Sequence, residues 1–362
     1  MPGKKRSATP PKPDRPRRTS GPSRRRGVRF QVPPWLRKGT AWTAWGYLIL
    51  VGFTAAFIWT QGDNWWPATV LLYGPRWLLL LPALPLALAA VLIRPLLLLP
   101  VGAAVLVTLG PTMGFRTGWR GWITSDPPRS LRVITFNLQG HSNPMLRQVP
   151  GELEHYGADV VVFQECPEQV AYAGLWPAGW TAQVTTDGFC LASRFPIAES
   201  KVLERLETQD QSGTGNAALF RLRADFGTID FVVLHLETPR QGLAPLRSEG
   251  SASALRGNIV IRAAGARRIS RWIQSETTNP VIAGDLNLPV ESRIYRDFFG
   301  HCANAFSITG RGFGWTRVLK NRFSIRIDHV LACGTWRPIH TEVGPDLGSD
   351  HLPVIVDLGI AR

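Results

Sequence analysis

Residues 280–287, PVIAGDLN, run from an apolar stretch into a cluster of polar side chains, and this pattern recurs through the second half of the chain. Short runs rich in Val, Ile and Phe, bounded by Gly, Pro, Asp and Asn, predict strands. Strands are predicted over 131–137, 159–164, 189–193, 217–223, 229–235, 281–284, 325–331 and 353–357. Helices are predicted over 144–157 and 256–275, and a long loop over 238–256. This mixture predicts an α/β or α+β domain over 131–362.

Polar clusters lie in or just after the apolar runs, where strands should end. Carboxylates, amides and imidazoles are costly to bury singly, so a series of strand ends that each carry one indicates a common pocket. The clusters are Phe136-Asn137, Gln164-Glu165, His235, Gly284-Asp285-Leu286-Asn287, Ile327-Asp328-His329 and Ser349-Asp350-His351. A pocket of acids, amides and histidines predicts metal-assisted hydrolysis.

Oxygen-bearing side chains in these clusters suit a divalent metal. Mg²⁺ (or Mn²⁺) prefers oxygen ligands, so Asn137, Glu165 and Asp350 are the candidate metal ligands. Asp285 and Asn287 lie two positions apart, and on an extended chain they point the same way. One carboxylate beside one amide can orient an attacking water.

Two histidines complete the candidate catalytic set. Asp328 is suited to orient the imidazole of His351, on the logic of a catalytic triad. His235 ends an apolar strand and could donate to a phosphoryl oxygen. Taken singly, these residues are more often turn formers, caps or satisfied core groups than catalytic residues. The combination of clusters in this order is much more specific than its parts.

The ordered set resembles the endonuclease/exonuclease/phosphatase superfamily, the DNase I-like fold of pancreatic-type DNase, abasic-site endonucleases, bacterial sphingomyelinases and inositol polyphosphate phosphatases. The resemblance covers 131–362. It implies a four-layer sandwich of two mixed β-sheets flanked by helices. It also implies that Asn137 and Glu165 hold the metal, with Asp350 close to it.

The same resemblance implies catalytic roles. Asp285 and Asn287 would position the water and the phosphate, His235 and His351 would stabilise the pentavalent phosphoryl group, and Asp328 would pair with His351. The general base stays unassigned. One departure is that no mid-domain Tyr or Arg segment for gripping DNA can be placed in this sequence.

Charge is divided unevenly along the chain. Residues 1–40 hold 13 Lys or Arg and one acid, which predicts a disordered basic tail. Residues 41–113 are almost uncharged and very apolar. From residue 121 onward there are 24 basic and 24 acidic residues, so the net charge of +15 arises ahead of the polar domain. A neutral domain argues against a dedicated nuclease, because phosphate neutralisation dominates the affinity for duplex DNA.

Three apolar segments predict transmembrane helices over 41–60, 77–93 and 95–113, followed by a linker over 114–130. The alternative is a cleaved signal peptide followed by core helices. The positive-inside rule places the tail in the cytoplasm. There it either only fixes the topology or binds anionic lipids of the inner leaflet as well. Three crossings then place the polar domain outside the cell membrane. If 77–113 failed to span, the domain would be cytoplasmic.

The cysteines all fall in the polar domain and match no zinc-binding spacing. An extracytoplasmic location permits disulfides, and Cys302 with Cys333 is the first pair to test. Buried free thiols are the alternative.

The three membrane segments ahead of this domain resemble VanJ-type membrane proteins, which are linked to glycopeptide and teicoplanin resistance. This implies a lipid-linked cell-wall substrate such as undecaprenyl pyrophosphate. We therefore expect a membrane-anchored, metal-dependent phosphohydrolase whose tether raises the effective concentration of a lipid substrate. The arginines Arg240, Arg311, Arg317, Arg322 and Arg326 could bind a further phosphate, or could be solvated surface.

Other functions are compatible with the sequence. A membrane-bound or extracytoplasmic nuclease is the main alternative, and a sphingomyelinase-like phospholipase is another. A non-enzymatic interaction module would require that the polar clusters serve no chemistry. The oligomeric state is not predicted.

Overall fold

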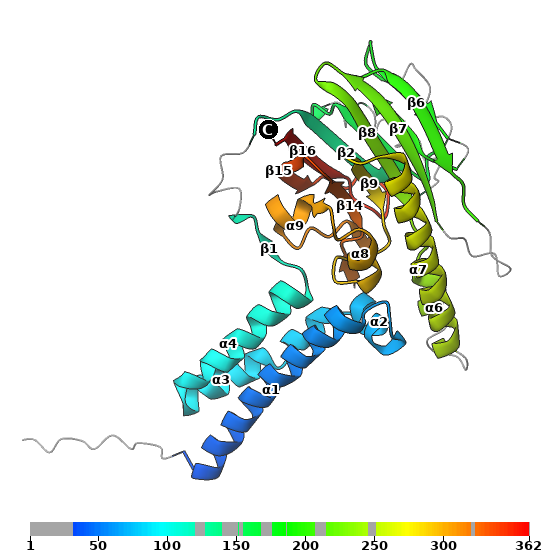
Figure 1. Cartoon of the computed structure of the whole chain (residues 1–362). Coiled ribbons are helices and arrows are strands. Elements are labelled where there is room, and N and C mark those ends of the chain that lie inside the picture. The colour runs from blue at the N-terminus through cyan, green and yellow to red at the C-terminus, as the bar shows by residue number, and fades with distance from the viewer. Residues whose placement is uncertain are drawn as a thin grey trace, which may run out of the picture.

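The computed structural model describes residues 32–119, 127–139, 151, 155–167, 176–185, 187–206, 215–244, 251–319 and 323–361. A helical region at the N-terminal end leads into a domain built from two sheets (Figure 1). Most of the expected basic tail and most of the expected helix over 144–157 lie outside the described residues.

The helical region holds three stretches, among the described residues, that are long and apolar enough to cross a membrane: Pro34–Gln61, Arg76–Ile93 and Pro95–Thr112. Its elements are α1 (Pro34–Gln61), α2 (Trp66–Tyr73), η1 (Arg76–Leu80), α3 (Ala83–Ile93), η2 (Pro95–Leu97), α4 (Leu98–Val107) and η3 (Thr108–Thr112). Helices thus cover the apolar segments over 41–60, 77–93 and, as far as Thr112, 95–113, in which transmembrane helices were predicted.

Helix α1 begins at Pro34, so residues 34–40 of the expected disordered tail are helical. Proline suits this position because its fixed φ is ready for a helix and its missing N–H would have no partner in the first turn. The short α2 was not predicted, since eight residues give too little periodicity to separate a helix from an apolar loop.

Two six-stranded sheets form the frame of the domain within the described part of the chain. The first has the order β15-β16-β2-β3-β5-β4, with bounds Trp336–Val343, Val354–Ile360, Leu131–Asn137, Val160–Gln164, Cys190–Ser193 and Thr181–Val184. The second has the order β10-β14-β9-β8-β7-β6, with bounds Ala303–Asn304, Asp328–Ala332, Val281–Asp285, Gly227–His235, Asn216–Ala224 and Ile197–Leu203. Both sheets are mixed, because β2 pairs with β3 and β8 with β9 in parallel while the other pairs are antiparallel.

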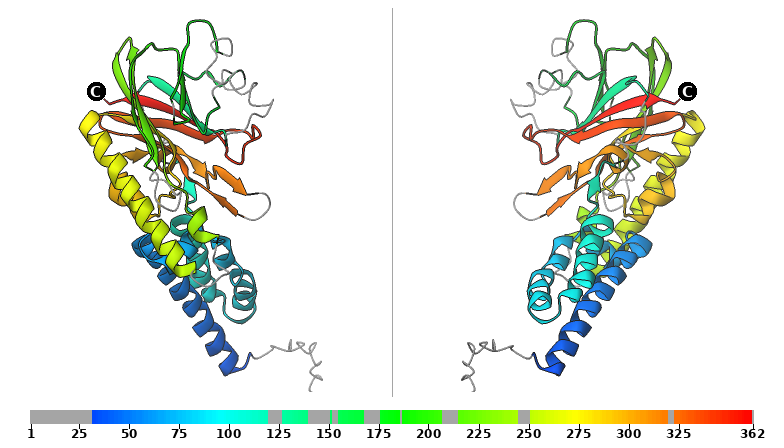
Figure 2. Two further views of the ribbon diagram at one scale, coloured as in Figure 1. Left: turned by 90° about the vertical axis from the view of Figure 1, so that its right-hand side faces the viewer. Right: turned by 90° about the vertical axis from the view of Figure 1, so that its left-hand side faces the viewer.

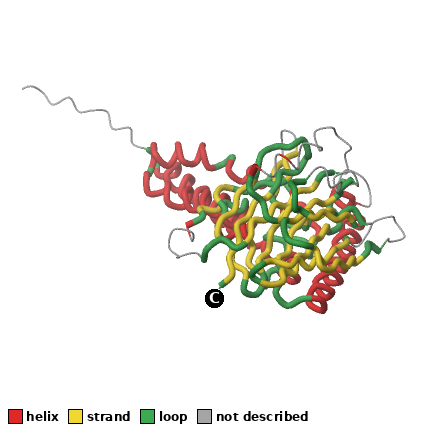
Figure 3. Tube along the Cα trace, turned by 90° about the horizontal axis from the view of Figure 1, so that it is seen from above, coloured by secondary structure: helices red, strands yellow, loops and turns green. Residues whose placement is uncertain are grey.

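The sheets pack face to face on a core of inward-pointing side chains that includes Val162, Phe231 and Val356. Helix α7 (Ser251–Glu276) covers the outer face of the second sheet through Ile269 and Ile273, together with the short α8 (Arg293–Phe298). Seen from above, the strands gather between helical segments (Figure 3). The predicted α/β fold of two mixed sheets flanked by helices is confirmed.

The sequence missed strands that lie at sheet edges. β4, β6 and β15 are each the last strand of a sheet, and they carry many polar side chains. Edge strands are covered less than central ones, so they lack the continuous apolar run on which the prediction relied. The expected strand over 325–331 is interrupted, with β13 (Phe323–Ile325) ending before β14 begins.

The expected loop over 238–256 is helical at both ends of its described part. Helix α6 (Arg240–Leu243) follows Pro239, and α7 begins at Ser251 rather than at 256. Two disulfides join Cys302 to Cys333 and Cys166 to Cys190. The first is the pair predicted for testing, and the second pair was not anticipated.

Several contacts attach the helical region to the domain. The backbone N–H of Arg293 donates to the carbonyl of Gly62 over 2.9 Å, and Arg76 lies 3.4 Å from Glu291. After the last apolar stretch, β1 (Arg116–Thr117) pairs with β11 (Arg311–Gly312) of the domain. The helices therefore meet the domain at one end, and the N-terminal end of α1 points away from it (Figure 2).

Candidate active site

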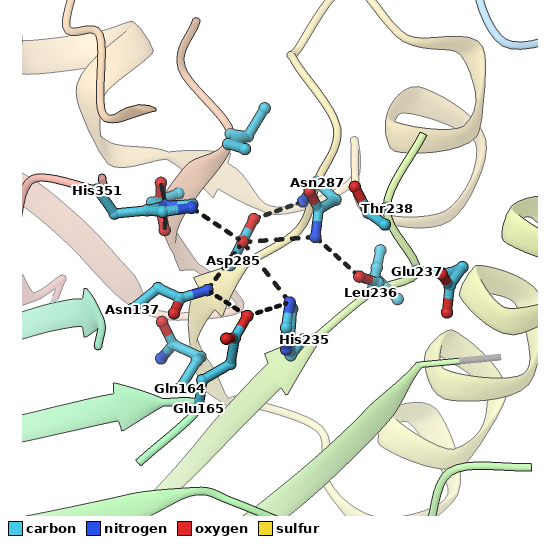
Figure 4. Close-up of polar contacts among 12 residues, drawn as sticks. Asn137, Gln164, Glu165, His235, Leu236, Glu237, Thr238, Asp285, Asn287 and His351 are labelled. Carbon is cyan, nitrogen blue, oxygen red and sulfur yellow. Dashed lines mark hydrogen bonds and ion pairs between the residues drawn. The ribbon is translucent and has the colours of Figure 1, made fainter. Parts of the chain in front are cut away.

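Sheet register brings the polar strand ends together. In the second sheet, Asp285 on β9 lies opposite His235 on β8 and opposite Asp328 on β14. In the first sheet, Asn137 at the end of β2 lies opposite Gln164, next to Glu165. The site therefore forms where the ends of strands from both sheets face one another (Figure 4).

Gly284 allows the close approach of β8 and β9 at this point. Its φ is 144°, and a Cβ here would lie 2.0 Å from the carbonyl oxygen of Leu234. Glu165 and Asn287 also have positive φ values, of 49° and 50°. Such conformations are uncommon for residues with side chains, and they concentrate at functional sites.

Asp285 lies at the centre of the site and is almost completely buried. Its Oδ1 accepts from the backbone N–H of Asn287 at 2.8 Å, and its Oδ2 accepts from Asn137 Nδ2 at 3.1 Å. His235 Nε2 and His351 Nε2 lie 3.6 and 3.7 Å from the same Oδ2. Burial and the charge of Asp328 raise the pKa of Asp285, although both histidines act against this rise.

Glu165 stands beside Asn137 and His235. The Asn137 amide donates to Glu165 Oε1 over 3.3 Å, and His235 Nε2 lies 3.7 Å from the same oxygen. The Glu165 side chain is 40% exposed, whereas Asp285 is 1% exposed. Glu165 is thus the most exposed of the site carboxylates. Asn287 donates from its side-chain amide to the Leu236 carbonyl over 2.9 Å.

His351 and Asp328 form the predicted pair. His351 Nδ1 lies 2.9 Å and 3.1 Å from the two carboxylate oxygens of Asp328. Burial alone would lower the pKa of His351, but the charges of Asp328 and Asp285 outweigh burial and raise it to about 9. Burial would raise the pKa of Asp328, but His351 outweighs it and the pKa is lowered. The two carboxylates therefore favour the charged imidazole, and Arg317 opposes it.

Asp350 and Arg317 lie beside this pair. Arg317 Nη2 donates to Asp350 Oδ2 over 2.7 Å, and Arg317 Nη1 lies 3.1 Å from His351 Nε2. Arg317 can only donate, so this contact is a hydrogen bond when His351 Nε2 carries no proton, and a phosphoryl oxygen placed between the two groups would accept from both. Asp350 Oδ1 is buried and has no hydrogen-bond partner among the described residues.

The donor set fits a divalent cation. Carboxylates from Glu165, Asp285, Asp328 and Asp350 crowd one site, and like charges at this spacing are unfavourable without a compensating cation. Ligand atoms of Asp285, Asp328 and His351 all lie within 4.8 Å of one another. The exposed carboxylate of Glu165 offers oxygen donors, which suit Mg²⁺ or Mn²⁺. Asn137 turns its amide nitrogen to Glu165 and Asp285, and its amide oxygen accepts from the backbone N–H of Gln139. The partnerless oxygen of Asp350 is a further donor.

A cavity of about 990 Å³ opens beside the site. From the domain it is lined by Asn287, Arg317, Asp350 and the predicted substrate-binding Arg240, among others. From the helical region it is lined by Tyr73, Gly74, Pro75, Arg76, Trp77 and Met113. The polar site and the ends of the apolar helices therefore share one cavity.

The remaining arginines separate by position. Arg326, predicted to bind substrate, is buried outside this cavity, with its guanidinium 4.6 Å from the ring centre of Phe306. Its neighbour Ile327 lines the cavity, and adjacent residues on an extended chain point to opposite sides. Arg311 pairs along β1, and Arg322 lies outside the described residues.

Sequence reasoning missed the contribution of the helical region to the site. Tyr73 and Trp77 line the cavity, and the Tyr73 hydroxyl lies 3.1 Å from the backbone oxygen of Asn287. One signal was available, because Asp63 is the single acid in the apolar stretch over 41–113. A lone acid in such a stretch indicates a buried partner elsewhere in the chain.

Comparison with known proteins identifies a family. The model of the endonuclease/exonuclease/phosphatase family matches residues 134–351. Similar solved structures include a humanized D. rerio TDP2 with 14 mutations, at 17% identity and a TM-score of 0.48, covering 63% of this chain and 98% of that one. A family protein from Bacteroides thetaiotaomicron has 16% identity and a TM-score of 0.48, covering 66% and 100%. The human Nocturnin catalytic domain with bound sulfate has 16% identity and a TM-score of 0.46, covering 68% and 100%. No curated protein matches the chain.

Proposed function

The chain belongs to the endonuclease/exonuclease/phosphatase family, and we propose that it is a membrane-anchored, divalent-metal-dependent hydrolase that cleaves a phosphoester or pyrophosphate bond of a lipid-linked substrate. The observation that carries this proposal is the cavity shared by the polar site and the helical region. A substrate with a phosphate at one end and an apolar chain at the other matches its two walls.

The chemistry of the cavity walls supports a lipid-linked substrate. Near the site, Arg317 and Arg240 supply positive charge for phosphate oxygens. Away from it, Trp77, Met113 and Leu243 offer apolar surface. The volume is at the upper end of the range of ordinary small-molecule pockets, so a headgroup and the first part of a lipid chain can be accommodated.

The surface of the helical region supports membrane anchoring. Large apolar side chains such as Trp42, Leu84 and Leu99 are more than two-thirds exposed. Exposed apolar surface of this kind is unfavourable in water and favourable in a bilayer.

The arrangement of helix ends supports an extracytoplasmic site. The end of α1, the start of η1 and the end of η3 all contact the domain or lie beside its contacts. Three crossings in this order put the N-terminus and the domain on opposite faces, and the positive-inside rule assigns the basic N-terminus to the cytoplasm. The two disulfides suit an oxidising compartment outside it.

Each site residue has a role in this proposal. Glu165, Asp350 and, through its amide oxygen, Asn137 would hold Mg²⁺ or Mn²⁺, with the buried carboxylates of Asp285 and Asp328 nearby. When bound, the metal supplies positive charge that neutralises the phosphate and polarises the scissile bond.

The remaining residues act on the water and the phosphoryl group. Asp285 and Asn287 orient the attacking water, since their carboxylate and amide lie side by side. The charged imidazole of His351, held by Asp328, stabilises the negative charge that develops on the phosphoryl oxygens. His235, whose Nε2 lies 3.6 Å from Asp285 Oδ2, donates a hydrogen bond to another oxygen of the phosphoryl group.

Hydrolysis by the full-length protein in detergent tests the proposal, followed as inorganic phosphate from undecaprenyl pyrophosphate and phosphoinositides, as phosphocholine from sphingomyelin and as fragments from DNA. The substrates are undecaprenyl pyrophosphate, sphingomyelin, phosphoinositides and DNA, each with and without Mg²⁺. We expect metal-dependent cleavage of a lipid-linked phosphate, and Glu165→Ala should lower its rate by roughly 10³-fold or more. Glu342→Ala, which changes an exposed carboxylate on β15, is the matched control and should leave the rate unchanged.

Binding of the metal gives a readout that does not depend on the substrate. A ligand that binds only the folded protein at 100 times its Kd adds about 2.7 kcal/mol to the free energy of unfolding. Mg²⁺ should therefore stabilise the native protein against heat, and Glu165→Ala should lose most of that stabilisation. Cleavage of DNA alone, or an unchanged rate in Glu165→Ala, would refute the proposed function.

A further inference from the structure

A fully buried ion pair joins the helical region to the catalytic domain. Asp63 lies between α1 and α2, and Arg262 lies on α7. Arg262 Nη1 donates to Asp63 Oδ1 over 2.7 Å, and the side chains are 1% and 0% exposed. Taking two charges out of water is costly, so such a pair is a poor source of stability and calls for another explanation.

Tyr73 completes this cluster from α2. Its hydroxyl lies 2.9 Å from Asp63 Oδ2 and accepts a hydrogen bond from Arg262 Nη2. The Arg262 guanidinium also lies 5.2 Å from the centre of the Tyr73 ring. Burial raises the pKa of Tyr73 well above its usual value, so the hydroxyl keeps its proton.

Two members of the cluster contact the backbone carbonyl of Asn287, a proposed catalytic residue. The Tyr73 hydroxyl and Arg262 Nη2 each lie 3.1 Å from the carbonyl oxygen of Asn287. Arg262 Nε donates to the carbonyl of Glu237 over 3.3 Å. Residues 287 and 237 lie on the two segments that carry Asp285 and His235, which Figure 4 shows side by side.

Asn287 needs such support more than most residues. Its backbone has a φ of 50°, a conformation that residues with side chains adopt only when their surroundings hold them there. Its amide at the same time bonds Leu236 and Asp285. The Asn287 carbonyl accepts from Arg262 Nη2 and shares the single hydroxyl proton of Tyr73 with Asp63 Oδ2. These contacts hold the backbone from which the Asn287 amide extends.

We propose that Asp63, Tyr73 and Arg262 are positioning residues for hydrolysis, which hold the Asn287 carbonyl and so make the helical region part of the catalytic centre. This inference rests on the proposed hydrolytic function. The roles divide within the cluster: Tyr73 and Arg262 contact the carbonyl, and Asp63 neutralises and orients Arg262.

Tyr73→Phe tests the inference because it removes only the hydroxyl and keeps the ring and the ion pair. We expect kcat to fall by roughly 10- to 100-fold, with KM changed less than about 3-fold, because the substrate still binds but the site is misaligned. Tyr47→Phe is the matched control, since its hydroxyl bonds the Leu79 carbonyl at 2.7 Å inside the helical region. The control should keep the native kcat.

A second variant and a second measurement separate positioning from folding. Asp63→Asn keeps the side-chain shape, and we expect it to lower both kcat and the melting temperature, whereas Tyr73→Phe should lower kcat with little change in melting. Amide hydrogen exchange over residues 284–290 should be faster in Tyr73→Phe than in Tyr47→Phe. This measurement needs no substrate, so it can be made whatever bond the enzyme cleaves.

The outcomes distinguish the two proposals. A native protein that cleaves none of the phosphate substrates would sink the proposed function, and the exchange comparison would still decide the inference. A native kcat in Tyr73→Phe, or equal exchange in the two tyrosine variants, would overturn the inference and leave the proposed function standing.

Discussion

Two buried polar clusters lie on opposite sides of Asn287, and their charge balance differs. The cluster at the site brings the carboxylates of Glu165, Asp285, Asp328 and Asp350 together with the cations of Arg317 and His351. The cluster at the helical region pairs one carboxylate, Asp63, with one guanidinium, Arg262. An excess of acid prepares a site to take up a cation, whereas a balanced pair holds two parts of a protein in place.

Hydrogen bonding shows the same difference. Both oxygens of Asp63 have partners, in Arg262 and Tyr73. Asp350 Oδ1 at the site has none among the described residues, although it is buried. A buried polar group without a partner lowers stability, and proteins keep such groups where they take part in a reaction. Mutation in the cluster at the site should therefore lower activity more than stability, whereas removal of one charge of the ion pair at the helical region should strongly lower stability.

The largest expected effect is on catalysis, from Asp285→Asn. The exchange removes the central carboxylate and keeps its shape, and we expect kcat/KM to fall by roughly 10³-fold. Stability should stay the same or rise at pH 7, because the raised pKa of Asp285 means that its charged form is disfavoured in the folded state. Enzyme assays and thermal melts on one preparation measure both. A large loss of stability would show that the site cluster is structural after all.

The next effect is on stability, from Arg262→Ala. Removal of one partner leaves Asp63 buried without its cation, and we expect a loss of about 3–5 kcal/mol in the free energy of unfolding. The double variant Asp63→Leu with Arg262→Met should recover most of this loss, because it leaves no unpaired charge. Chemical denaturation in detergent gives the values. A double variant as unstable as the single one would contradict the charge-pair explanation.

The smallest effect concerns His329, which contrasts with His351 although its chain neighbour Asp328 bonds His351. Burial and the charge of Arg326 lower the pKa of His329 to about 4. Between pH 6.5 and 4 the unfolded chain therefore takes up a proton that the folded protein does not. The contribution of the neutral His329 to the free energy of unfolding is fully present above pH 6.5 and is lost as the pH falls, by about 2 kcal/mol at pH 5.

Denaturation at pH 7 and pH 5 checks this prediction. His329→Gln should show a smaller difference between the two pH values than the native protein. His340→Gln, at an exposed position on β15, should behave like the native protein. If His329→Gln kept the full difference, the acid sensitivity would have to originate at the carboxylates of the site.

The central strands and the site could be predicted from the sequence because both depend on local patterns. β2, β3, β8, β9 and β16 are mostly apolar and mostly buried. β2, β3, β8 and β9 each end on a polar residue of the site or next to one, and the cluster of residues 349–351 comes just before β16, so the order of the clusters along the chain carried the family resemblance. The match of the family model over 134–351 agrees with that resemblance.

What the sequence could not predict depends on partners far away in the chain. Arg326 and Ile327 are neighbours, and only the register of the sheets decides which of them faces the cavity. Cys166 pairs with Cys190 across strands β3 and β5, which is a property of the sheet order. Asp63 and Arg262 are separated by 199 positions. Distances of this kind leave no periodic trace in the sequence.

Contacts at Gly62, at Arg76 and along β1 attach the domain to the helical region, and they fix the distance between the site and the ends of the apolar helices. With the helices in a bilayer, the reactive groups sit at a constant distance from the lipid surface and cannot swing out into solution. A substrate dissolved in water would have to reach a cavity that opens beside the helix ends, whereas a lipid arrives there by sideways diffusion within its own leaflet. For the proposed membrane-anchored enzyme acting on a lipid, the search for substrate would be two-dimensional, and its rate would depend on how fluid and how crowded that leaflet is.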